Sequence, residues 1–173
     1  MTLADLLDWQ SWAHTLMGNV HFIAALIALL LGPVILFRRK GDRAHRWLGR
    51  GWALIMLGVD VSALSMYELN GRPNLFHLFA LVSLSALIPG VRAIWRYQRS
   101  GLRDDLITHQ ICMCWAYMGL VFAGVWQVAT RVVVITEALP VGPAFGILGA
   151  LTFAASITFN RYLKQRYATP VPG

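Results

Sequence analysis

Five stretches of about twenty mostly apolar residues constrain this chain more than any other feature. They cover roughly residues 17–37, 46–67, 75–95, 106–129 and 142–162. A helix needs about 20 such residues to cross the hydrocarbon layer of a bilayer. With 57% hydrophobic and 13% charged residues, the 173-residue chain has more apolar surface than a soluble domain of this length buries. We therefore expect an all-α integral membrane protein with five transmembrane helices.

The connections between these stretches are short, which forces neighbouring helices to run antiparallel. The expected architecture is an up-and-down bundle with a four-helix core. Ten-residue alternating patterns typical of a membrane barrel are absent from the sequence. The expected regions are an outer interfacial segment (1–16), the four-helix membrane core (17–129), and an outer link, fifth helix and cytoplasmic tail (130–173).

Basic residues are distributed unevenly along the chain. Thirteen of the 15 Lys and Arg follow the first, third and fifth stretches, whereas only Arg72 and Arg131 fall on the other side. Cytoplasmic loops carry such an excess, so we expect the N-terminus outside and the C-terminus in the cytoplasm of the cell inner (plasma) membrane. The net charge of +7 is thus explained by topology and does not indicate nucleic-acid binding.

Four histidines lie near the starts of four consecutive apolar stretches: His21, His45, His77 and His109. Because the helices alternate in direction, His21 and His77 are expected near the outer face, and His45 and His109 near the inner face. In a bundle of four, each of these pairs lies on diagonal helices at matched depth. Two imidazoles so placed suit axial ligation of haem iron. The pattern therefore predicts two haem b groups, one in each leaflet.

Several other residues could support such sites. Gly49 lies four residues after His45 on the same helix face and leaves space for a large ring. Asp60 is a carboxylate inside the second stretch, where it could relay protons, pair with Arg131 or bind the outer histidines. Candidate partners for haem propionates are Arg43, Arg46 and Arg50 near the inner site, and Arg72 and Arg131 near the outer site.

Two cysteines, Cys112 and Cys114, lie within the fourth stretch. Residues two apart on a helix point to different faces, so these thiols cannot bridge each other there. We expect them to pack as small apolar side chains.

The runs "RRKGDRAHRWLGR", "NLFHLF" and "THQICMCWAYMGL" resemble a family of predicted membrane proteins of unknown function, number 2306, over about residues 15–135. That resemblance brings no assigned activity. The four alternating histidines also resemble the cytochrome b561 class, which implies a transmembrane electron carrier, and hence an oxidoreductase. His21 and His77 would then hold the outer haem, and His45 and His109 the inner one. The extra helix follows the core here instead of preceding it, and no ascorbate-binding motif is recognisable.

Two other classes of function stay open at this point. One is a histidine-based site for zinc or proton transport, or for a membrane metal-hydrolase, built on the outer side from His14, His21, His77 and Asp60. The other is a membrane assembly subunit without a cofactor. Candidate partners are membrane lipid, a quinone or another small redox donor or acceptor, and a second copy of the chain.

Overall fold

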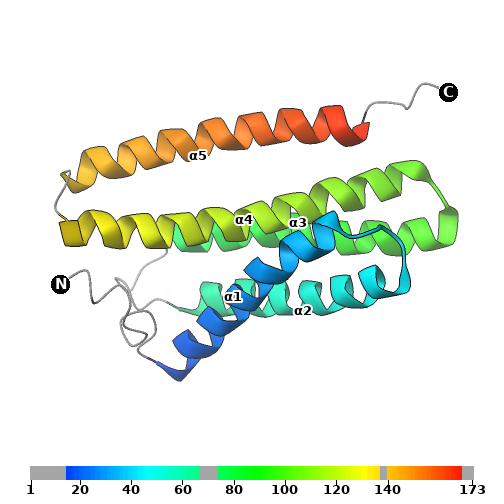
Figure 1. The fold of residues 1–173 in the computed structure, drawn as a ribbon, viewed down its shortest axis with the longest axis horizontal. Helices are drawn as coiled ribbons and strands as arrows, with labels where there is room; N and C mark the ends of the chain where they lie inside the picture. Colours follow the sequence, from blue (N-terminus) through cyan, green and yellow to red (C-terminus); the bar gives the residue numbers. More distant parts are fainter. Residues whose placement is uncertain (1–14, 67–73, 137–139, 169–173) are drawn as a thin grey trace.

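The computed structural model describes residues 15–66, 74–136 and 140–168, and every regular element in them is helical. Five helices are long and apolar enough to cross a membrane, which confirms the predicted all-helical class and number of spans (Figure 1). A short π-helical turn, Lys164–Ala168, follows the last of them. The helices are α1 (Leu16–Phe37), α2 (Arg43–Ser65), α3 (Leu75–Ser100), α4 (Arg103–Thr136) and α5 (Val141–Leu163).

Three of the helices extend beyond the apolar stretches that predicted them. Helix α2 begins at Arg43, where Asp42 caps it, and α3 continues to Ser100. Gly101, in the left-handed conformation at φ 67°, ends α3 and leaves only a two-residue turn before α4. Most of the basic residues between the third and fourth apolar stretches therefore lie in helices instead of in a loop. The length of an apolar stretch corresponds to the thickness of the hydrocarbon layer, whereas the hydrogen-bonded helix continues beyond that layer into the polar interface.

Helices α3 and α4 form the most extensive helix pair. A Cβ placed at Gly90 would clash with the side chains of Met113 and Cys112, and one at Gly119 would lie 3.2 Å from Cβ of Ser83. Small residues let helix backbones approach closely in lipid, where apolar burial alone does not drive association. The buried residues of α3 repeat every three or four positions and are His77, Ala80, Ser83, Ala86, Leu87, Gly90 and Ala93.

Helix α1 contains Pro33, which has no N–H to donate to the carbonyl of Leu29. The hydroxyl of Tyr117 on α4 donates to that carbonyl at 3.2 Å. One residue away, Trp52 Nε1 on α2 donates to the Ala28 carbonyl at 2.9 Å. Two aromatic donors thus satisfy the backbone around the proline, as an apolar solvent requires. Helix α1 runs obliquely across its neighbours instead of parallel to them (Figure 1).

Among the described side chains, the buried apolar cluster is formed by residues of α1 to α4 and includes none from α5. Helix α5 lies beside α4, on the side away from α1 and α2 (Figure 1). Trp126 Nε1 donates to Thr152 Oγ1 at 2.9 Å, and the rings of Trp115 and Phe159 meet edge-on at 5.4 Å. The cluster residues are Ala28, Trp52, Met56, Val59, Ala86, Leu87, Ala116 and Leu120.

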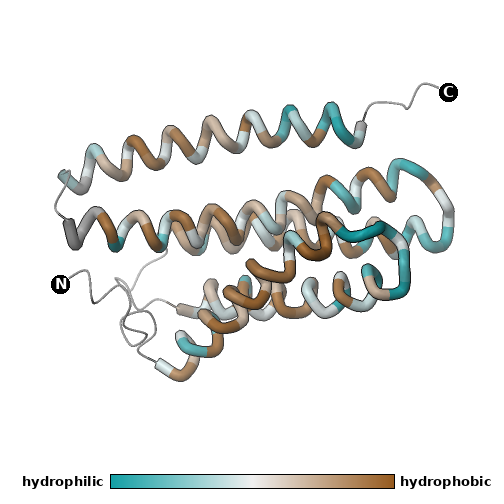
Figure 2. Tube along the Cα trace, viewed as in Figure 1, coloured by the Kyte–Doolittle hydropathy of each residue, from teal (hydrophilic) through white to brown (hydrophobic). Residues whose placement is uncertain are grey.

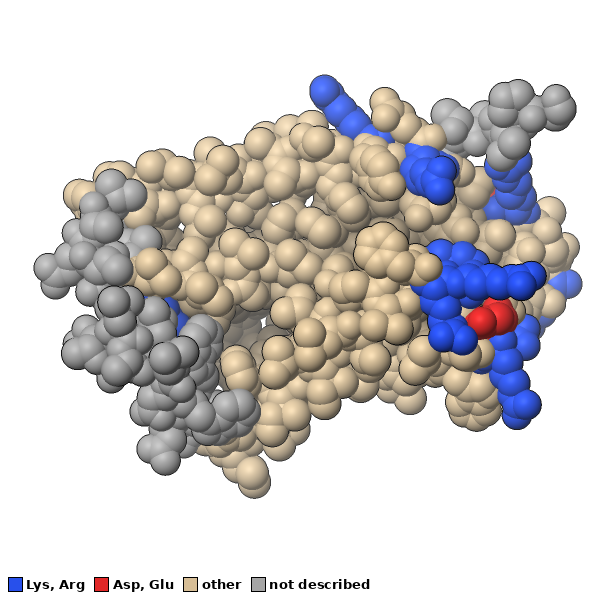
Figure 3. Space-filling model, in the orientation of Figure 1, with Lys and Arg blue, Asp and Glu red and all other residues tan. Residues whose placement is uncertain are grey.

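Polar residues gather at the ends of the helices, and apolar residues cover their middles (Figure 2). The α1–α2 connection, the α3–α4 connection and the end of α5 lie at one end of the molecule (Figure 1). Most of the visible Lys and Arg side chains crowd this end, which we call the basic end (Figure 3). Arg72 and His14 fall outside the described residues. The orientation of the chain and its division into three regions stay predictions.

Candidate functional site

The four candidate histidines divide between the two ends of the helices. His45, on α2, and His109, on α4, lie toward the basic end, whereas His21, on α1, and His77, on α3, lie near helix starts at the opposite end. Each side chain is at least partly buried. The four differ in what their ring nitrogens contact, and those contacts decide which nitrogen could bind a metal.

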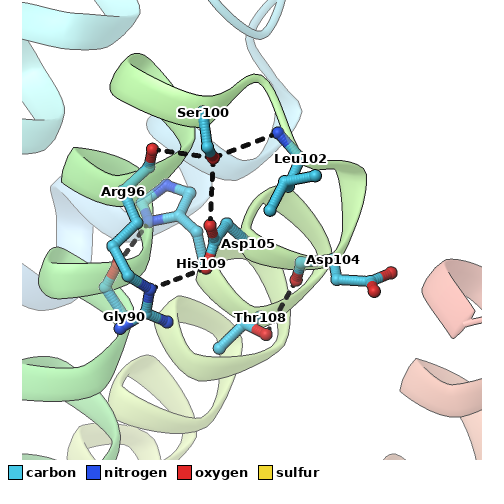
Figure 4. Close-up of polar contacts among 8 residues, drawn as sticks. All are labelled: Gly90, Arg96, Ser100, Leu102, Asp104, Asp105, Thr108 and His109. Carbon is cyan, nitrogen blue, oxygen red and sulfur yellow. Dashed lines mark hydrogen bonds and ion pairs between the residues drawn. The ribbon is translucent and has the colours of Figure 1, made fainter.

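His109 has one ring nitrogen fixed by the backbone of α3. Its Nδ1 lies 2.9 Å from the carbonyl oxygen of Gly90 (Figure 4). A carbonyl only accepts hydrogen bonds, so Nδ1 carries the proton and the neutral ring keeps its lone pair on Nε2. Histidines that bind metals commonly donate their other N–H to a carbonyl in this way.

His45 occupies the first turn of α2, and both His45 and His109 lie toward the basic end of their helices. The Nδ1 of His45 is buried and has no hydrogen-bond partner among the residues that the structure describes. An unsatisfied buried nitrogen costs free energy, which a bound ligand could recover. Helices α2 and α4 are not among the pairs that pack closely in the described parts of the chain. His45 and His109 are therefore carried by two helices that do not pack closely on each other.

Three charged residues in the connection between α1 and α2, Arg38, Lys40 and Asp42, bond to each other or to the adjacent helix ends. The backbone N–H of His45 donates to Asp42, which holds the pKa of that carboxyl below its usual range, and Arg38 at 3.3 Å adds to the effect. Lys40 Nζ donates to the carbonyls of Ile35 and Leu36 at the end of α1. Burial lowers the pKa of Lys40, and the Cys114 thiol nearby opposes that shift.

His21, at the opposite end, is held by α2. Its Nδ1 lies 2.8 Å from Ser62 Oγ, and the Ser62 hydroxyl donates to the Val59 carbonyl at 2.9 Å. Because the hydroxyl proton is already used, Nδ1 of His21 is the donor in the first contact. The lone pair of the neutral ring is again on Nε2.

His77 is buried and takes part in capping its own helix. The backbone N–H of Asn74 donates to His77 Nδ1 at 3.2 Å, and the Asn74 side chain accepts from the backbone of Phe76 at 2.9 Å. The same Nδ1 lies 3.0 Å from Asn74 Oδ1. His77 thus meets both a donor and an acceptor on Asn74, and the contact permits either tautomer. This histidine stabilises the start of α3 through a capping box.

The residues predicted to support the haem sites lie as follows. A Cβ at Gly49 would meet nothing within 4 Å, so space is open beside His45. Arg50 stacks over the ring of Trp47 at 5.8 Å, and Arg43 and Arg46 are also exposed near the start of α2. Arg131 is half-buried in the last part of α4, toward the opposite end.

Asp60 is buried in α2, and only 3% of its surface is exposed. The Ser83 hydroxyl on α3 donates to its Oδ2 at 2.8 Å. Burial of a carboxylate is costly unless hydrogen bonds or charges compensate it. Ser83 is a partner that the sequence analysis did not name.

Cys112 and Cys114 are both free thiols, and Cys114 is buried and shares a hydrogen bond with Tyr167. Within the described ranges, His, Cys, Asp and Glu form no group of three or more that could hold a metal ion. Any site in these residues therefore has at most two protein ligands from this set.

Three groups that orient the histidines were not predicted from the sequence: Ser62, Asn74 and the carbonyl of Gly90. Ser62 and Asn74 could have been predicted as hydrogen-bonding groups, because a serine inside a span and an asparagine before a helix both commonly bond to nearby backbone groups. A carbonyl leaves no signal in the sequence, since every residue has one.

The fold and the buried polar side chains define the class as a multi-pass, all-helical membrane protein. The chain belongs to the family described as "Predicted membrane protein (DUF2306)", whose family model matches residues 18–165. The match includes α5, which the sequence resemblance over about residues 15–135 left out. No curated protein and no solved structure matches the chain.

Proposed function

We propose that this membrane protein is a b-type dihaem electron carrier. The inner haem would be held by His45 and His109, and the outer haem by His21 and His77. One observation carries the proposal: His109 has its Nδ1–H fixed on Gly90, which leaves the lone pair of the neutral ring on Nε2, and His45, on another helix, has a buried Nδ1 without a hydrogen-bond partner among the described residues. Bis-histidine haem ligation requires two imidazoles carried by different helices.

The chemistry of the residues at the basic end suits a haem group. When bound, haem would supply one-electron redox chemistry. The Gly90 carbonyl orients the His109 ring and increases its basicity through the bond to Nδ1. Gly49 leaves open space on the helix that holds His45, and Arg43 and Arg46 are exposed where they could bind propionates.

Sites at opposite ends of the helices would let electrons cross the bilayer. The excess of Lys and Arg at the basic end favours a cytoplasmic location for the His45 and His109 site, in the inner (plasma) membrane. A quinone or another small redox compound would serve as donor or acceptor, and the protein would act as a transmembrane oxidoreductase.

Haem accounts for these residues better than zinc does. Structural and catalytic zinc sites use three or four protein ligands, and the described residues bring no such group together. A haem iron needs only two axial imidazoles. An assembly subunit without a cofactor would leave unexplained why the contacts of both His21 and His109 put the lone pair of the neutral ring on Nε2.

Electron transfer across vesicles tests the proposed function. The protein, purified after expression with ample haem, is reconstituted into vesicles that contain ferricyanide, and dithionite is added outside. We expect ferricyanide to be reduced faster than in protein-free vesicles, and the His45→Leu/His77→Leu variant to lose that gain. Equal rates with and without the haem-loaded protein would contradict the proposal.

A further inference from the structure

One face of α3 is exposed along its whole length and changes character toward the basic end. Apolar side chains occupy its first part: Leu78, Leu81, Val82 and Ile88 are 53%, 54%, 39% and 43% exposed. The exposed Ser85, whose hydroxyl donates to the Val82 carbonyl of the same helix, lies between Val82 and Ile88. From Ile88 a spacing of three and four residues continues into Arg92, Trp95, Arg96 and Arg99. We call the four apolar residues and the last four residues the α3 stripe.

The basic part of the α3 stripe surrounds a shallow hollow. Its volume is about 250 Å³, and it is lined by Arg92, Trp95, Arg96 and Arg99. Three guanidinium groups share this helix face, and the carboxylate of Asp105 pairs with the guanidinium group of Arg96. The indole of Trp95 is 60% exposed among them. The hollow therefore combines anion-binding groups with an aromatic ring of the type that lies at headgroup level in membranes.

The turn that follows holds one of these arginines in place. Arg96 Nε donates to Asp105 Oδ1 at 2.7 Å (Figure 4). Ser100 Oγ donates to the Arg96 carbonyl at 3.0 Å and accepts from the Leu102 N–H at 3.2 Å. Arg92 and Arg99, one turn to either side, have no hydrogen-bond or ion-pair partner in the residues that the structure describes. Their guanidinium groups are available to an external anion.

We propose that the α3 stripe binds an anionic phospholipid of the surrounding membrane. Arg92 and Arg99 bind the headgroup phosphate in the hollow, since each guanidinium group can donate two parallel hydrogen bonds to a phosphate. Trp95 lies at the level of the headgroups. An acyl chain follows the stripe from Ile88 to Leu78, a rise of about 15 Å, which equals one leaflet of a hydrocarbon layer about 30 Å thick.

The apolar part of the stripe favours a lipid over a soluble phosphate compound. A soluble anion would use the arginines alone and leave Leu78 to Ile88 without a role. The charge of the hollow also disfavours zwitterionic lipid, whose choline or ethanolamine group would meet the arginines with like charge. This inference is independent of haem binding, because no residue of the stripe is a proposed ligand.

Tryptophan quenching by brominated lipid tests the site directly. The full chain is reconstituted in dioleoyl phosphatidylcholine vesicles with a small fraction of brominated phosphatidylglycerol or, in parallel, brominated phosphatidylcholine. The signal of Trp95 is obtained by difference from a Trp95→Phe variant. We expect Trp95 to be quenched preferentially by the anionic lipid, and the preference to fall about fivefold for each arginine removed in Arg92→Gln/Arg99→Gln.

A matched control separates a site from diffuse surface charge. Arg103→Gln/Arg161→Gln removes the same charge from exposed arginines at the basic end that do not line the hollow. In this variant, Trp95 should still be quenched preferentially by the anionic lipid. An equal loss in both variants, no preference in the unmodified chain, or displacement of the lipid by millimolar inorganic phosphate would each overturn the proposal. If the double variant fails to fold, Arg99→Gln alone should lower the preference about fivefold.

Discussion

The histidines at the two ends of the helices differ in what their contacts do for the fold. At the basic end, His109 is oriented by a carbonyl of the neighbouring helix, and Nδ1 of His45 is buried without a partner among the described residues. At the opposite end, His21 is oriented by Ser62, whereas His77 caps the helix that carries it.

The difference shows that burial and position near a helix start do not by themselves identify a ligand. His77 would stabilise α3 even in a protein without haem, because its imidazole completes a capping box. The Nδ1–H of His109 instead bonds a carbonyl of the neighbouring helix α3, which leaves the lone pair of the neutral ring on Nε2. The proposal is therefore stronger for His45 and His109 than for His21 and His77, and the four changes below probe that contrast.

The largest effect is expected from His109→Leu. Loss of one axial ligand should remove the inner haem and leave the outer one, so the haem bound per chain falls by about half. The pyridine haemochrome assay on purified protein measures this ratio. Thr108→Val is the matched control, because the Thr108 hydroxyl bonds only the Asp104 carbonyl of its own helix. Unchanged haem content in His109→Leu would exclude this pair as ligands.

Gly49→Leu should block the open space near His45. Leucine favours helix more than glycine does, so the haem-free protein should fold at least as well. We expect severalfold less inner haem, measured by the same assay. Gly58→Leu, at another open glycine of α2, should retain its haem. Similar haem content in both variants would show that the ring does not approach Gly49.

Ser62→Ala removes the acceptor that orients His21. Loss of such a supporting bond typically weakens metal affinity by about tenfold. Transfer of haem to an excess of apomyoglobin measures how firmly the outer haem is retained. Ser65→Ala is the control, since the exposed Ser65 hydroxyl donates only to the Ser62 carbonyl. If the two variants release haem equally, Ser62 has no part in orienting a ligand.

Asn74→Ala separates the capping role at the start of α3 from ligation. The helix start should lose about 1 kcal/mol of stability, because the Phe76 N–H loses its side-chain acceptor. His77 loses its contact with Asn74 Oδ1 but keeps the bond from the backbone N–H of residue 74 to its Nδ1, so the haem content should fall less than in Ser62→Ala. Thermal unfolding in detergent gives the stability. A loss of haem without a loss of stability would reverse the assignment of His77.

The spans were predictable because crossing a membrane requires a certain length and an apolar composition, and both can be seen in the sequence. The exact helix ends were harder to predict, since α3 and α4 remain helical through most of the charged residues on either side of Gly101. The oblique path of α1 and the donors from Trp52 and Tyr117 to its carbonyls depend on which helices meet around Pro33. That information is not local in the sequence.

The candidate site was predictable in part. The histidines stand out because imidazole is rare at regular positions in apolar helices. Their orientation was not predictable, because it depends on the Gly90 carbonyl and on Ser62, which reach His109 and His21 from other helices. Likewise, Asp60 was recognised as an ionisable group within a span, but its contact with Ser83 required the packing of α2 against α3.

The visible spectrum of the purified protein tests the central claim most directly. Expressed with ample haem, the protein should show redox-responsive bands of six-coordinate, low-spin haem b. His45→Leu and His77→Leu should each remove about half of that signal. A colourless protein under the same conditions would contradict haem ligation by these histidines.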